Sequence, residues 1–131
     1  MSVEELVNEA WRRWNRGERD PDPALFAEDI EIHSALAQTV FKGYDGVAAW
    51  TTEIDEQFKH WEVVVDGFDV LDDHRAVAHG HIEAQGRGSG LAMNQEASWL
   101  VTVHDGRITS IRNYIGTDAA ASAAAGGAED A

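Results

Sequence analysis

The chain has 131 residues, a formal net charge of −14 at pH 7 and no cysteine. This length suits one domain with its own core, and the lack of cysteine excludes disulfides and thiolate chemistry. With 24 acidic against 10 basic residues, the surface would repel nucleic acid and anionic membranes. We find no signal peptide and no apolar run of roughly 20 residues, so we expect a cytoplasmic protein.

The N-terminal half is predicted to hold three helices and one strand. A capping box of Ser2 and the glutamate three residues later opens the first helix, and Gly17 ends it. Asp22, followed by proline, predicts a second, short helix, because proline suits the first helical position. Alternation over residues 30–34 predicts a strand, and apolar residues at helical spacing predict a third helix from about 45 to 58.

The C-terminal half is predicted to form four antiparallel strands. Turns are expected at Asp72-Asp73, in the glycine-rich segment 86–90 and at Asp105-Gly106. Asp-Gly between two alternating runs is the strongest short-range hairpin signal. In this last hairpin, the alternation places Trp99 and Asn113 on the inner, otherwise apolar face.

These elements together predict the fold class. Helices gathered on one face of an antiparallel sheet define an α+β architecture. We therefore expect an α+β cone, in which a curved antiparallel sheet wraps around three N-terminal helices. This domain is expected over residues 1–117, followed by an Ala/Gly-rich tail of low complexity over residues 118–131.

Five short segments and one tyrosine resemble a known family in their order and spacing. They are Asn15-Arg16-Gly17-Glu18, Leu25-Phe26-Ala27-Glu28-Asp29, Phe41-Lys42-Gly43, Gln85-Gly86-Arg87, Asp105-Gly106-Arg107-Ile108 and Tyr114. Over about residues 3–116 the chain resembles the SnoaL-like proteins of the nuclear-transport-factor-two-like superfamily. The resemblance implies the α+β cone but no single activity, because this fold hosts isomerases, cyclases, epoxide hydrolases and plain binding modules.

Two activities of the superfamily are disfavoured by the residues present. The steroid isomerases use a tyrosine, a carboxylate base and a protonated aspartic acid. The resemblance places these at Ala10, Ser34 and Trp99, none of which can do the same chemistry. The epoxide hydrolases use aspartates and an arginine on neighbouring strands, and the strand 95–103 carries neither residue type.

Three residues are candidates for catalysis. His33 lies near the expected mouth of the pocket and could act as a general base, or it is a surface histidine on the outer face. Tyr114 and Arg112 would enter the pocket only if the last hairpin slipped by one residue, which turns a strand over. The inward faces otherwise carry no carboxylate, so no catalytic dyad is identified. Enzymatic activity of a cyclase, isomerase or hydratase type stays open.

The expected pocket is walled by aromatic and small side chains. Three tryptophans from different elements are predicted to face the concave side of the sheet, where they form an aromatic wall or simply fill the core. Two polar residues could orient a carbonyl or hydroxyl group of a ligand. The expected lining residues are Ala10, Trp14, Ser34, Trp50, Ala78, Gly80, Trp99 and Asn113. We therefore expect a small apolar or aromatic ligand and no cofactor.

Three polar residues alternate on one strand. His79, His81 and Glu83 share a face and could bind zinc or iron, with Glu96 as a further ligand. Their apolar neighbours are expected on the pocket face, which places all three on the outer face. We therefore expect no metal and a homodimer formed through the outer sheet face. Such an interface would lose association as pH falls if protonation brought like charges together.

Overall fold

The structure is a computed structural model that describes residues 2–34, 39–88 and 92–115. The predicted tail over 118–131 and part of the glycine-rich segment 86–90 lie outside these residues. Neither helix in the described part is both long enough and apolar enough to cross a lipid bilayer.

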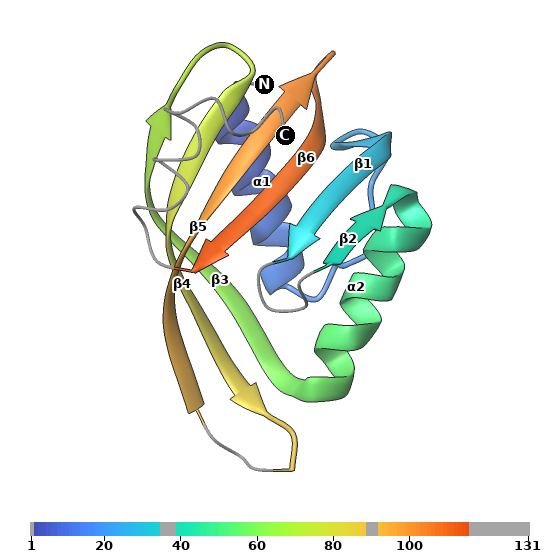
Figure 1. Ribbon diagram of the computed structural model, residues 1–131, viewed down its shortest axis with the longest axis vertical. Helices are drawn as coiled ribbons and strands as arrows, with labels where there is room; N and C mark the ends of the chain where they lie inside the picture. Colours follow the sequence, from blue (N-terminus) through green and yellow to red (C-terminus); the bar gives the residue numbers. More distant parts are fainter. Residues whose placement is uncertain (1, 35–38, 89–91, 116–131) are drawn as a thin grey trace.

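Two helices and six strands make up the described part of the chain (Figure 1). In chain order they are α1 (Val3–Asn15), β1 (Phe26–Ser34), β2 (Thr39–Lys42), α2 (Gly43–Gln57), β3 (Phe58–Val70), β4 (Arg75–Gly86), β5 (Ala92–His104) and β6 (Arg107–Ile115). The strands form one sheet in the order β2-β1-β6-β5-β4-β3. Both helices pack on the same face of this sheet and share one hydrophobic core with it. The α+β class is therefore confirmed.

The predicted second helix is wrong. Asp22 makes a single turn, in which its carbonyl accepts from the N–H groups of Leu25 and Phe26, both at 2.9 Å. The chain then leaves the turn because the N–H of Ile108 bonds to the carbonyl of Leu25 at 2.7 Å and draws the segment onto β6. β1 starts at Phe26 and runs parallel to β6. The sheet is consequently mixed, and two helices rather than three cover it in the described part.

The first helix begins and ends as predicted. Ser2 Oγ accepts from the N–H of Glu5 at 3.1 Å, and the Glu5 carboxylate accepts from the N–H of Ser2 at 2.9 Å. These bonds to Ser2 lower the pKa of Glu5. At the other end, the Asn15 amide donates to the Val63 carbonyl at 2.7 Å and accepts from the Val63 N–H at 3.0 Å. Asn15 thus fixes the end of α1 to β3, at the edge of the sheet.

The last hairpin has the predicted turn and register. Asp105 and Gly106 both have positive φ, 52° and 75°, as a two-residue Asp-Gly turn requires. Trp99 lies opposite Asn113 across the two strands. Tyr114 packs instead against a small cluster on the opposite face of the sheet. The alternative register, slipped by one residue, therefore does not occur.

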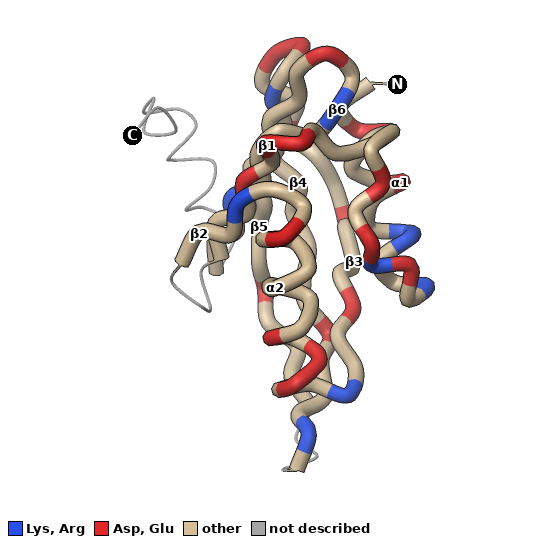
Figure 2. Tube along the Cα trace, turned by 90° about the vertical axis from the view of Figure 1, so that its right-hand side faces the viewer, with Lys and Arg blue, Asp and Glu red and all other residues tan. Residues whose placement is uncertain are grey.

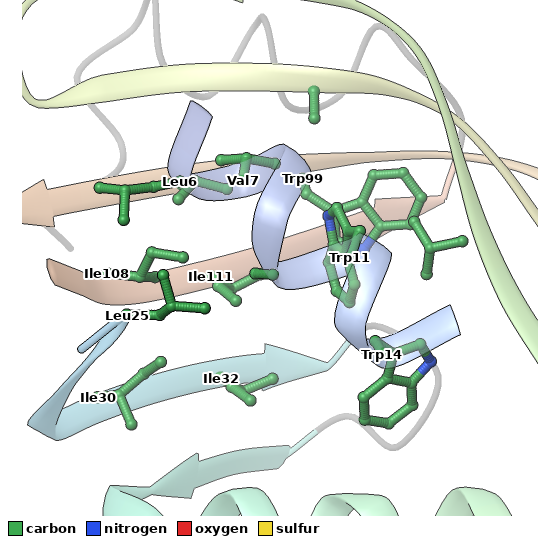
Figure 3. Close-up of a cluster of buried hydrophobic side chains, with 14 of the residues drawn as sticks. Leu6, Val7, Trp11, Trp14, Leu25, Ile30, Ile32, Trp99, Ile108 and Ile111 are labelled. Atoms are coloured by element: carbon green, nitrogen blue, oxygen red, sulfur yellow. The ribbon is translucent and has the colours of Figure 1, made fainter. Parts of the chain in front are cut away.

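The core lies between α1 and the concave face of the sheet (Figure 3). Figure 3 shows Leu6 and Val7 of α1 close to Ile108 and Ile111 of β6, and Trp11 beside Trp99 of β5. Leu6, Val7 and Ile108 are each 1% exposed. Burying a side chain of this size contributes about 1.5–3 kcal/mol, so this contact holds α1 in place.

Candidate functional site

A cavity of about 320 Å³ opens beside the core, and its walls come from both helices and four of the six strands. Its aromatic lining residues are Trp11, Trp50, Phe58, Trp61 and Trp99. Its aliphatic and thioether lining residues are Ile32, Ile54, Val63, Met93 and Ile111. Its polar lining residues are Ser34, Glu53, Gln57 and Asn113. An apolar cavity with few polar groups is the usual form of a small-molecule site.

The aromatic rings of the walls are in contact with one another. The ring centroids of Trp99 and Trp11 are 5.7 Å apart, and those of Trp11 and Trp14 are 6.4 Å apart. Trp14 continues the series to Trp50 of α2 at 4.6 Å. Such pairs stabilise each other by about 0.5–1.5 kcal/mol beyond their burial. The series therefore forms a well-supported wall that runs from β5 across α1 to α2.

The polar lining residues come from the sheet and from α2. The Asn113 amide nitrogen donates to the carbonyls of Ser98 and Tyr114 at 3.2 and 3.4 Å, which leaves its oxygen to accept from a ligand. Glu53 and Gln57 are one turn apart on α2, and both are exposed. They therefore line the part of the cavity that is open to solvent.

Four of the eight predicted pocket residues line this cavity: Ser34, Trp50, Trp99 and Asn113. Ala10 and Trp14 line a second cavity of about 40 Å³, which shares Trp11 and Trp50 with the first. Ala78 and Gly80 line neither of the two. Ala78 is fully buried in the core, and the space over Gly80 is occupied by the backbone of β3.

Sequence reasoning missed several lining residues, and one of them corrects an expectation. The inward faces were expected to carry no carboxylate, but Glu53 lines the cavity. The signal was present, because Trp50, Glu53, Ile54 and Gln57 are spaced as one stripe of a helix. Trp11 is also absent from the predicted lining, although it lines both cavities.

The three catalytic candidates do not line either cavity. His33 alternates with Ile32 and Ser34, which face the large cavity, and its imidazole lies 3.1 Å from the Glu31 carboxylate. Arg112 and Tyr114 alternate with cavity residues in the same way on β6. All three side chains therefore lie on the outer face of the sheet. Of the positions matched to the steroid isomerases, Ser34 and Trp99 lie in the large cavity and Ala10 in the small one.

The outer face carries histidines that are paired with carboxylates. His79 Nε2 is 2.6 Å from Asp69, and His81 Nε2 is 2.8 Å from Glu83. The other nitrogen of His81 is 3.5 Å from Asp66. Within the described residues, no group of three or more histidine and acidic side chains has an arrangement that could hold a metal ion. These histidines instead neutralise acidic neighbours when they are protonated.

His81 is expected to make stability depend on pH. The hydrogen bond to Glu83, and then Asp66, raise the pKa of His81 above 6.5, and Glu96 is its cross-strand neighbour on β5. The pKa of His81 is higher in the folded than in the unfolded state, so protonated His81 stabilises the fold. This stabilisation is fully present below the unfolded-state pKa and is lost as pH rises through the folded-state pKa. The free energy of unfolding of the wild type should therefore fall as pH rises above 6.5, the ordinary pKa of histidine, and His81→Gln should flatten this slope. Urea unfolding across this range measures it, with His104→Gln, at an exposed histidine, as the control.

Solved structures of the nuclear-transport-factor-two-like class match the fold. A protein from Jannaschia sp. CCS1, provisionally named a SnoaL-like polyketide cyclase, is 21% identical, with a TM-score of 0.72 over 92% of this chain and 89% of that one. A provisionally named polyketide cyclase from Pseudomonas putida KT2440 is 22% identical, with a TM-score of 0.72 over 90% and 94%. A hypothetical protein with a ketosteroid isomerase-like fold from Catenulispora acidiphila DSM 44928, in complex with trimethylamine, is 15% identical, with a TM-score of 0.77 over 88% of each chain. At these identities the likeness shows the fold alone.

The fold is thus nuclear-transport-factor-two-like. The family model of the SnoaL-like domain matches residues 7–111, and the chain belongs to this family. No curated protein matches the sequence.

Proposed function

We propose that the protein binds a small apolar or aromatic molecule in the 320 Å³ cavity. The observation that carries this proposal is the aromatic wall, in which four tryptophans and Phe58 surround the space. Trp11, Trp61 and Trp99 are 3–6% exposed, so their rings are held in place by the core. Rigid aromatic walls lose little conformational entropy when a flat ligand enters. The cavity is also at the lower end of the size range of about 300–1,000 Å³ that is usual for such sites.

Filling the cavity is expected to block binding. Val63→Phe adds a ring at a lining position of β3, and we expect affinity for the neutral aromatic probe N-phenyl-1-naphthylamine to fall at least about tenfold, because the added ring occupies the ligand's space. Quenching of tryptophan fluorescence on titration measures this affinity. The matched control is Val70→Phe on the same strand, where the side chain is 55% exposed and outside the cavity. Equal affinity of Val63→Phe and wild type, with folding verified by circular dichroism, would place the probe elsewhere.

A second candidate function is an enzyme of the cyclase, isomerase or hydratase type. Glu53 favours it, because this is an ionisable side chain that could exchange a proton with a bound molecule. The provisional cyclase names of two neighbours in the fold agree with this class of reaction. A binding role alone predicts that bound ligands are recovered unchanged. Product formation that Glu53→Gln abolishes would favour the enzyme.

We also propose a cytoplasmic homodimer that pairs through the outer sheet face. Val77 and Leu100 form a small apolar cluster on this side of the sheet, but both are already buried within one chain, so the proposal rests on the face as a whole and not on this cluster. The carboxylates beside His79 and His81 mean that protonation brings opposite charges together, so the expected loss of association in acid does not follow from the geometry. Sedimentation at neutral pH tests the dimer, and a monomer's coefficient would contradict it.

A further inference from the structure

We propose that the cavity selects a cationic ligand, an alkylated amine or quaternary ammonium on an apolar or aromatic body, with Glu53 as its counter-ion. This inference rests on the proposed binding function and adds the charge of the ligand to it. Three features carry it: the charges of the cavity lining, the indole faces and the position of Glu53.

The cavity offers a negative charge and no positive one. All ten lysine and arginine side chains of the chain stand at described positions, and none of them lines the large cavity. Among the described lining residues, Glu53 is the single ionisable group. An anionic ligand would lose its hydration without meeting a counter-charge, which is a large cost. The net charge of −14 further attracts cations and repels anions at a distance.

The two helices beside the cavity differ in charge. Figure 2 shows acidic positions on both helices, and basic positions on α1 but not on α2. Arg13 and Arg19 are the basic residues that line the adjacent smaller cavity, and both are already paired. Arg13 pairs with Glu9 and Asp22, and Arg19 lies 2.9 Å from Asp55. The positive charge of each guanidinium is therefore already balanced by carboxylates of the protein.

The indole rings attract positive charge through their faces. A cation over a tryptophan face is stabilised by about 0.5–1 kcal/mol at exposed sites and by about 2 kcal/mol or more where water is excluded. The protein already uses its own tryptophans in this way, since the Arg19 guanidinium lies 4.2 Å from the centre of the Trp14 ring. Trp14 in turn contacts Trp50, which lines the large cavity. The large cavity has four tryptophans among its lining residues, and each could hold a cation in the same way.

Glu53 is placed to complete the site. It lies on α2 one turn after Trp50, so the carboxylate and the indole line the same cavity. The nearby carboxylate of Asp55 is taken by Arg19, whereas Glu53 has no salt bridge to any described residue. An ammonium group held between the indoles would therefore find an available carboxylate at the open end.

The test uses two probes of nearly equal shape and different charge, and a smaller aromatic anion as the third. Phenyltrimethylammonium and tert-butylbenzene differ by a nitrogen cation in place of a carbon atom, and benzoate carries a negative charge. We expect the wild type to bind phenyltrimethylammonium at least fivefold more tightly than benzoate, measured by tryptophan fluorescence and calorimetry. Glu53→Gln should weaken the ammonium about fivefold and leave tert-butylbenzene within twofold. Glu56→Gln removes the same charge from an exposed position of α2 outside the cavity and should change neither.

The outcomes separate the two proposals. If tert-butylbenzene binds in the cavity but benzoate binds as tightly as the ammonium, or Glu53→Gln behaves like Glu56→Gln, the cation preference is wrong and the apolar binding site stands. If none of these probes nor N-phenyl-1-naphthylamine binds, the proposed function itself fails.

Discussion

Gly80→Ala is expected to lower the free energy of unfolding by about 3 kcal/mol, because overpacking against rigid groups costs about 1–3 kcal/mol and sometimes more. A Cβ atom at position 80 would lie 1.9 Å from the Val64 carbonyl oxygen and 3.0 Å from the Val65 Cα. Both atoms belong to the backbone of β3, which is paired with β4 on both sides of a bulge between Val65 and Gly67. The backbone must shift to admit the methyl group, because neither atom can rotate away.

Gly67→Ala is the matched control, since it makes the same change on the neighbouring strand. A Cβ at Gly67 would meet nothing within 4 Å. Its effect should stay within about 0.5 kcal/mol, as for most surface substitutions. Urea unfolding followed by circular dichroism measures both variants. If Gly80→Ala and Gly67→Ala both change the free energy of unfolding only slightly, β3 and β4 can move apart at the bulge with little loss of stability, and the prediction is wrong.

Trp11→Ala is expected to lower the free energy of unfolding by about 3–5 kcal/mol, the usual range for a buried tryptophan. The Trp11 side chain is 6% exposed and its ring contacts both Trp14 and Trp99. It also lines both cavities, so its loss joins them into one larger space. The cost therefore includes the lost aromatic contacts and the cavity left behind.

Two further variants show whether the indole itself is responsible. Trp11→Phe keeps an aromatic ring and should lose less than half as much stability. Trp50→Ala removes a half-buried indole of α2 and should cost less than Trp11→Ala. A larger effect at Trp50 would show that the core depends more on α2 than on the wall formed by α1. Urea unfolding by circular dichroism is again the measurement, because it does not depend on tryptophan emission.

Elements specified by contacts within a few residues were predictable from sequence. The bonds between Ser2 and Glu5 start α1 where the pattern predicts it. Asp105-Gly106 forms the last turn because both residues tolerate positive φ. That turn also sets the register, which explains why Trp99 and Asn113 were placed on the correct face. In each case the decisive partners are neighbours along the chain.

Half of the predicted pocket residues line the candidate cavity for the same reason, and half do not. Alternation along a strand or helix predicts which face a side chain takes, and this found Ser34, Trp50 and Trp99. It does not say how close the next strand comes, so Gly80 was expected to leave space that the β3 backbone occupies. The sequence pattern also missed Glu53, because only the apolar residues of α2 were assigned to its inner face.

Residue type and short spacing were enough to predict the family resemblance, the α+β class, the starts of the first helix and the last hairpin, and the aromatic interior. The fate of the turn at Asp22 depended instead on a partner distant in sequence, because pairing with β6 made the following segment a strand and not a helix. The set of side chains that share one cavity likewise depended on how the elements pack. Trp11, Glu53 and Asn113 are far apart in sequence and meet because α1, α2 and β6 pack on one core.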